Sequence, residues 1–115
     1  DNIYIWDYAS NFDDYLTPTP VLYGLKQQLP FYKFVGVKGI FLNASGDSYS
    51  PFKDMKTFVA ADLMIDIDLP VDSLCTKYLT ENYPLSGKIL AGYYLSLEKR
   101  LEAKNKPYNI YGGFR

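Results

Sequence analysis

The sequence contains no histidine. A chain without histidine has no Ser-His-Asp or Cys-His catalytic unit of its own and no histidine-ligated zinc site. Its single cysteine, Cys75, cannot form a disulfide within the chain. Cys75 lies in a segment with helical periodicity, so we expect a buried small apolar side chain and not a nucleophile.

The sequence also lacks an excess of charge and a long apolar run. The formal net charge is −1, which gives no electrostatic basis for binding nucleic acid or an anionic membrane. No apolar run approaches the ~20 residues of a membrane-spanning helix, so we expect no membrane span. No signal peptide is visible, which is compatible with a chain that starts after one or inside a larger protein.

What the sequence does contain is typical of one globular domain. It has 115 residues, of which 48% are hydrophobic and 22% charged, enough for a single core. Aromatic residues make up 17%, with 12 tyrosines. Tyrosine combines a flat apolar ring with a polar tip, which suits protein interfaces, sugar clefts and cores alike.

The N-terminal stretch predicts a strand–helix–strand unit. Asn2 to Trp6 or Asp7 is rich in β-branched and aromatic residues and apolar on both sides, which is typical of an interior strand. Pro20–Val35 carries a leucine stripe of helical spacing, with Thr19 as its expected cap, and we expect Pro30 to kink or restart the helix. Gly36 suits the helix C-terminus, and Val37–Leu42 is the second strand. This order predicts a right-handed crossover between parallel strands.

Three further helices are predicted, over 52–65, 71–83 and about 86–104. In the last helix, Glu98 falls on the side we expect to face solvent. The expected buried stripe of that helix consists of Ile89, Leu90, Tyr93, Leu97 and Leu101. Two strands are too few for a parallel sheet covered on both faces. Either the tail, 106–115, adds a strand or the chain is a piece of a larger α/β protein, and we expect the second.

Several blocks of the sequence resemble a known family. They are Ile5-Trp6-Asp7-Tyr8, Asn11-Phe12, Tyr15-Leu16 and Gly36-Val37-Lys38-Gly39-Ile40-Phe41. Together they look like the final portion of an uncharacterised bacterial family, domain of unknown function 4838. That family is similar to α-glucuronidases and β-hexosaminidases, which are (β/α)8-barrel glycoside hydrolases.

The resemblance implies an architecture. The fold class would be α/β, the C-terminal portion of a (β/α)8 (TIM) barrel with two parallel strands and three to four helices. Residues 1–65 would be the last βαβα units, 66–105 a helical C-terminal extension and 106–115 a tail. The implied protein is secreted or periplasmic in a bacterium, and the implied partners are a carbohydrate and the remainder of the parent barrel.

The candidate substrate-binding residues follow the two strands. Parallel strands joined by a crossover end at the same edge, so we expect the groups after them to converge there on one ligand. Asp7 fits either a sugar hydroxyl or a cap on its own loop backbone. Trp6 and Tyr8 offer rings for stacking, with barrel core as the alternative for Trp6. Asn43 and Ser45 fit sugar hydroxyls or loop-turn chemistry equally.

No catalytic residue is named. Asp13, Asp14 and Asp47 read as turn residues. The second strand runs into Leu42-Asn43-Ala44-Ser45, where the family usually has Glu or Gln, and the acid/base residues of related barrels lie on earlier strands. The acidic segment 66–72 lacks the glycine and terminal glutamate of a calcium loop, so helix capping is favoured there. We expect neither a metal nor a cofactor.

Two functions of different classes remain open. The first is a fragment of a glycoside-hydrolase-like protein that binds or processes a polysaccharide, inactive as an isolated chain; whether the parent is an enzyme is uncertain. The second is a non-catalytic α/β module that docks a protein partner through a Tyr-rich surface. The positions of Tyr8, Phe12, Tyr15 and Tyr49 would separate them. A groove beside Asp7 and Asn43 favours sugar, a flat exposed patch favours docking, and dispersal in the core supports neither.

Overall fold

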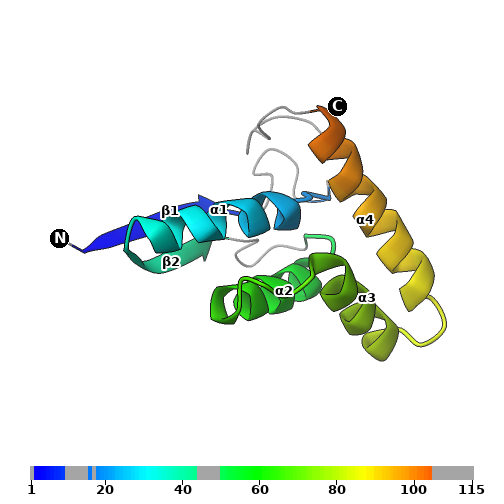
Figure 1. Ribbon diagram of the computed structural model, residues 1–115. Helices are drawn as coiled ribbons and strands as arrows, with labels where there is room; N and C mark the ends of the chain where they lie inside the picture. Colours follow the sequence, from blue (N-terminus) through cyan, green and yellow to red (C-terminus); the bar gives the residue numbers. More distant parts are fainter. Residues whose placement is uncertain (1, 10–15, 17, 44–49, 105–115) are drawn as a thin grey trace.

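The computed structural model of the protein describes residues 2–9, 16, 18–43 and 50–104 (Figure 1). The predictions on Ser45, on the remaining loop residues Phe12, Asp13, Asp14, Tyr15, Asp47 and Tyr49, and on the tail 106–115 lie outside these residues. In chain order the elements are β1 (Ile3–Tyr8), α1 (Leu22–Phe34), β2 (Val37–Asn43), α2 (Lys53–Ile65), α3 (Val71–Asn82) and α4 (Gly87–Lys104). The α/β class is therefore confirmed, with two parallel strands and four helices among the described residues.

The strands β1 and β2 pair in parallel, as predicted. The register places Ile5 opposite Ile40 and Trp6 opposite Phe41. Helix α1 connects the strands and lies alongside them at one end of the molecule (Figure 1). Gly36 directly follows the end of α1 with a φ of 85°, a left-handed conformation that glycine adopts without strain. The predicted glycine cap is thus confirmed.

Helix α1 differs from its prediction at its start. It begins at Leu22, and Val21, not Thr19, is the N-cap residue, with no capping bond from its side chain. Pro30 lies inside a helix that continues to Phe34. The first amide groups of α1 are bonded instead by Glu98, a residue 76 positions further along the chain. A cap supplied from another helix leaves no local sequence signal.

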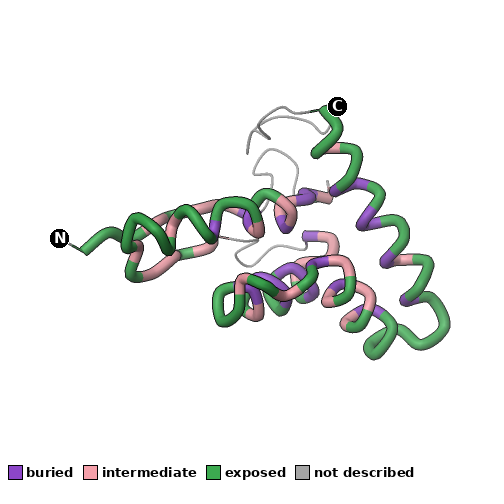
Figure 2. Tube along the Cα trace, viewed as in Figure 1, coloured by how far each residue is buried: buried purple, intermediate pink, exposed green. Residues whose placement is uncertain are grey.

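The hydrophobic core lies where the four helices meet. Figure 2 shows buried residues gathered there, whereas the strands are mainly exposed or intermediate. Leu22, Leu25 and Leu29 of α1 pack with residues of the other three helices, and Ile40 and Leu42 of β2 pack against this core. The predicted burial of Cys75 is confirmed as well, since 0% of its surface is exposed.

Helix α2 begins after an unusual backbone conformation. Phe52 has a φ of 62°, in the left-handed region that a bulky residue rarely adopts. Its ring packs against Tyr94 of α4, with centroids 5.1 Å apart. This packing holds Phe52 in place at the entrance to α2.

Helices α3 and α4 approach each other closely through a glycine. A Cβ atom at Gly87 would lie 2.2 Å from the carbonyl oxygen of Leu79. Only a residue without a side chain fits at this crossing.

The predicted buried face of α4 is wrong in part: Leu97 is buried and Leu90 packs against the core as predicted, but other positions differ. Ile89 and Tyr93 are 76% and 50% exposed, whereas Glu98 is only 1% exposed. The helix packs through Gly87, Ala91, Tyr94 and Leu95, a stripe of helical spacing that brings small residues against α3. Glu98 continues this stripe, and its carboxylate is buried because donors surround it.

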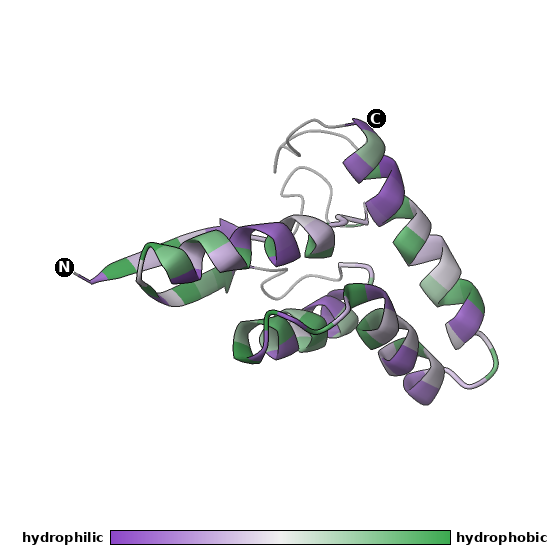
Figure 3. Cartoon of the chain, viewed as in Figure 1, coloured by the Kyte–Doolittle hydropathy of each residue, from purple (hydrophilic) through white to green (hydrophobic). Residues whose placement is uncertain are grey.

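The sheet has one covered face and one open face. Tyr4 and Trp6 of β1 are 68% and 61% exposed, and Phe41 of β2 is 55% exposed. Figure 3 shows hydrophobic residues along both strands at this end of the molecule. None of the helices among the described residues is both long and apolar enough to span a membrane.

Candidate functional site

The carboxyl ends of β1 and β2 lie side by side. The register pairs Tyr8, the last residue of β1, with Asn43, the last residue of β2. The backbone N–H of Ala9 donates to the carbonyl oxygen of Asn43 at 2.9 Å, which extends the pairing one residue beyond the strand. The two predicted residues Tyr8 and Asn43 are therefore brought together. We call this pair of residues the strand-end site.

The strand-end site shares its face with the exposed aromatic rings. Successive side chains of a strand alternate between faces, so Tyr8 lies on the same face as Trp6, and Asn43 on the same face as Phe41. The Trp6 and Phe41 rings pack with centroids 4.5 Å apart. Below them, the Tyr4 ring lies over Gly39, where a Cβ atom would come within 3.1 Å of it. We call Tyr4, Trp6 and Phe41 the open aromatic face.

Asp7 is turned to the other face of the sheet. By the same alternation it lies with Ile5, on the side of the helix α1. Its Oδ1 accepts the backbone N–H of Tyr8 at 2.8 Å, which is the capping interaction that the sequence left open. Burial raises the pKa of Tyr32 in α1, and the nearby Asp7 charge raises it further. The structure therefore does not place Asp7 with Tyr8 and Asn43 on one face.

The chemistry that this edge offers is binding chemistry. It presents aromatic rings and an amide, which stack on and hydrogen-bond to a sugar. A glycosidase uses a pair of carboxyl groups, and the described strand segments 2–9 and 37–43 contain Asp7 as their one carboxylate. No three acidic, cysteine or histidine side chains that could hold a metal ion gather among the residues that the structure describes.

A buried polar cluster behind the strand ends was not foreseen from the sequence. Lys56 of α2 is 3% exposed, and its Nζ donates to the carbonyl oxygens of Ala9 at 2.8 Å and Thr19 at 3.3 Å. Glu98 of α4 accepts the backbone N–H of Leu22 at 2.8 Å and that of Tyr23 at 3.3 Å. The Tyr94 hydroxyl donates to Glu98 Oε2 at 2.6 Å.

Burial dominates the electrostatics of this cluster. It lowers the pKa of Lys56 to about 8, and the Glu98 charge opposes this by raising the pKa. It raises the pKa of Glu98, an effect that the bond from Tyr94, the two amide bonds and the Lys56 charge oppose. It also raises the pKa of Cys75 to about 12, so the thiol stays protonated and unreactive at neutral pH.

One sequence signal could have found Glu98. Tyr94 and Glu98 are four residues apart, and so lie on one helix face with Ala91. A reading of α4 centred on this stripe would have placed Glu98 in the core. Lys56 carries no such signal, because its acceptors are backbone carbonyls that any sequence supplies.

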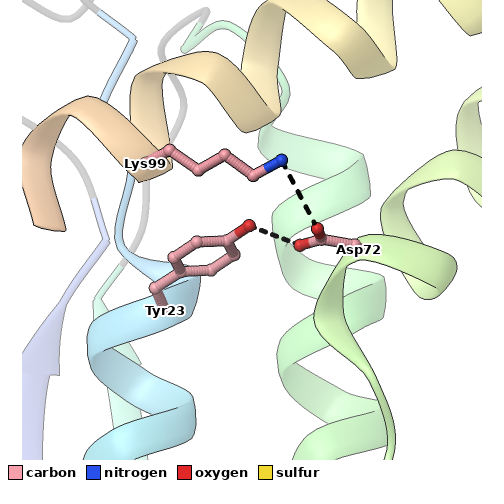
Figure 4. Close-up of polar contacts among 3 residues, drawn as sticks. All are labelled: Tyr23, Asp72 and Lys99. Carbon is pink, nitrogen blue, oxygen red and sulfur yellow. Dashed lines mark hydrogen bonds and ion pairs between the residues drawn. The ribbon is translucent and has the colours of Figure 1, made fainter.

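A second polar cluster ties three helices together near the surface (Figure 4). The Tyr23 hydroxyl donates to Asp72 Oδ1 at 2.5 Å, and Lys99 Nζ lies 3.8 Å from Asp72 Oδ2. Burial and the bond to Asp72 raise the pKa of Tyr23. The Lys99 and Asp72 side chains are 63% and 49% exposed, so we interpret the cluster as a structural tie between α1, α3 and α4.

The comparison with protein families gives one match. The model described as Domain of unknown function (DUF4838) matches residues 1–95. The chain belongs to this family. No curated protein and no solved structure matches the chain. The family assigned from the sequence blocks is thus confirmed, and the likeness of the family to glycoside hydrolases stays a prediction.

Proposed function

We propose that the chain is the closing part of a (β/α)8 barrel in a glycoside-hydrolase-like protein that binds or processes a polysaccharide. The observation that carries this proposal is the strand-end site beside an open aromatic face. Ligands of parallel α/β folds bind at the carboxyl ends of the strands. In this proposal the protein is secreted or periplasmic in a bacterium, where polysaccharides are accessible.

The open aromatic face supports the barrel. Parallel sheets are covered on both faces in α/β proteins, and here α1 and the core cover one face only. In a barrel the inner face of each strand is filled by side chains from other strands. Trp6, Phe41 and Tyr4 would then be interior residues that the remainder of the parent barrel covers.

The strand-end site supports a sugar-binding role. Tyr8 would stack on a sugar ring, and the Asn43 amide would bond to its hydroxyls. Ser45 remains a proposed contributor, whereas Asp7 would act by holding the backbone at Tyr8 through the bond it already makes. Any catalytic carboxyl groups would come from other strands of the barrel, so the isolated chain would be inactive.

Calorimetric titration of the full-length protein against a panel of glycans tests the proposal. We expect Tyr8→Ala and Asn43→Ala each to weaken binding by about tenfold, as loss of one or two ligand contacts would. Tyr83→Ala is the matched control, because Tyr83 is 50% exposed at the end of α3 and should leave the affinity unchanged. Unchanged affinity in both strand-end variants would contradict the proposal.

The same open aromatic face supports the alternative, a docking module for a protein partner. Exposed aromatic rings on a rigid support are typical anchors of interfaces. In that case Trp6→Ser and Phe41→Ser would abolish capture of the partner, while Tyr8→Ala and glycan addition would have no effect. The two functions therefore differ in which residues matter.

A further inference from the structure

Ala9 connects the strand-end site to the buried polar cluster. It directly follows Tyr8 and is 1% exposed. Its N–H donates to the Asn43 carbonyl, and its own carbonyl accepts the bond from Lys56 at 2.8 Å. Lys56 therefore bonds to the residue that extends the pairing of Tyr8 with Asn43.

Both ends of the connection between β1 and α1 form hydrogen bonds with buried charged side chains. Lys56 bonds to Ala9 at the start of the connection and to Thr19 near its end. Glu98 then bonds to the first amides of α1, at Leu22 and Tyr23. Two buried charged side chains, from α2 and α4, thus fix where the chain leaves the sheet and where it returns.

Stability alone does not account for these two charges. Buried charges lose their hydration, and well-packed apolar residues of similar size are often as stabilising or more so. An ammonium and a carboxylate can instead fix the position of the groups that they bond to, because charge-assisted hydrogen bonds are short and strong. Every bond of Lys56 and of Glu98 in the cluster, apart from that of Tyr94, ends on the backbone of this connection or of the α1 start.

We propose that Lys56 and Glu98 are positioning residues of the strand-end site. Lys56 fixes the peptide that follows Tyr8, and Glu98 fixes the start of α1 and supplies the countercharge. Neither side chain touches the ligand. This role of the pair rests on the proposed function of the strand-end site, but its structural part is testable separately.

Hydrogen exchange in the full-length protein tests the structural part. In Lys56→Met the amides of Ala9 and of the end of β1 should exchange at least about tenfold faster. Peptides from α3 and the middle of α2 should keep their wild-type rates. Lys77→Met is the control, since Lys77 is exposed on α3, and it should change neither region. Equal acceleration everywhere, or no change at Ala9, would overturn the positioning role.

Glycan titration and rescue test the functional part. Lys56→Met should weaken the binding of any glycan that Tyr8→Ala weakens, by about tenfold, and Lys56→Arg should recover part of the loss because it keeps a charged donor. The melting temperature of each variant is recorded, so that a general loss of structure is recognised. Loss of binding without faster exchange at Ala9 overturns the positioning role. Unchanged binding in Tyr8→Ala and Asn43→Ala overturns the proposed function instead, and the exchange experiment then decides the role of Lys56 alone.

Discussion

The helical end of the molecule, where the four helices meet, and the strand end, formed by β1 and β2, differ in how far their apolar side chains are buried. At the helical end, α1 to α4 enclose a core in which Val59, Leu63 and Cys75 are each 0% exposed. This core even contains the charges of Lys56 and Glu98. At the strand end, two parallel strands leave Trp6 and Phe41 more than half exposed.

This difference is what our proposal explains: the helices bury their apolar side chains within the chain, and the strands would be covered by the remainder of a barrel. Burial of apolar surface is the main driving force of folding. At the helical end, the core side chains are buried within the chain itself. The strand end leaves aromatic side chains exposed to solvent, although parallel sheets in α/β proteins are usually covered on both faces. The following predictions separate the two ends, beginning with the largest effect.

Removing the Glu98 carboxylate should have the largest effect on stability. In Glu98→Ala the amides of Leu22 and Tyr23 and the Tyr94 hydroxyl lose their acceptor, and Lys56 loses its countercharge. We expect a loss of about 3–5 kcal/mol in the free energy of unfolding, measured with urea. Glu102→Ala, one turn further along α4 where the side chain is exposed, should change it by less than about 0.5 kcal/mol. Equal effects of the two variants would contradict the burial of Glu98.

Two glycines of α4 give opposite predictions. Gly87→Ala places a methyl group against the backbone of α3, and should cost about 1–3 kcal/mol because the helices must separate. Gly92→Ala meets nothing within 4 Å, and should stabilise the helix by about 0.5–1 kcal/mol. Thermal unfolding of both variants measures this. A stabilised Gly87→Ala variant would show that α3 and α4 do not pack as described.

The Lys56 ammonium should produce a pH dependence of smaller size. Its pKa is about 8 in the folded protein against an ordinary value of 10.5. The unfolded chain therefore binds more protons between these values, and the stability contributed at Lys56 rises with pH. From pH 8 to 9 the wild type should gain about 1 kcal/mol relative to Lys56→Met. The comparison removes the opposing contribution of Cys75, which both proteins share, and a constant difference would contradict the burial of the ammonium.

The smallest effect is expected on the open aromatic face. Trp6→Ser should change the free energy of unfolding of the chain by less than about 1 kcal/mol, since an exposed ring pair contributes little. Leu63→Ala, in the core, should cost about 2–5 kcal/mol by the same urea titration. If Trp6→Ser were as destabilising as Leu63→Ala, the strand end would belong to the core.

The sequence predicted those parts of the fold that depend on local chemistry. The apolar strands, the leucine stripe of α1 and the cap at Gly36 determined the parallel crossover, and each was readable from neighbouring residues. The start of α1 was not, because its cap is Glu98, far along the chain. Nor was the burial of Glu98 in α4, because a charged residue in a helix is expected to face solvent unless its donors are known.

The candidate site was predictable to the same extent. Strand parity and register brought Tyr8 and Asn43 together, as two strands ending at one edge require. Asp7 lies on the opposite face, because successive side chains of a strand alternate between faces. Residues that follow one another at the same edge of the sheet therefore need not share a face. Lys56 could not be found at all, since its role arises from carbonyl groups and from a position that folding alone creates.

Hydroxyl-radical footprinting with mass spectrometry tests the central claim most directly. The open aromatic face is uncovered in this chain, and we propose that the rest of a larger fold covers it. Trp6, the only tryptophan of the chain, and Phe41 should be oxidised readily in the 115-residue chain and strongly protected in the full-length protein. Leu85, which is 100% exposed, serves as the reference residue. Equal oxidation of Trp6 in both proteins would contradict the claim.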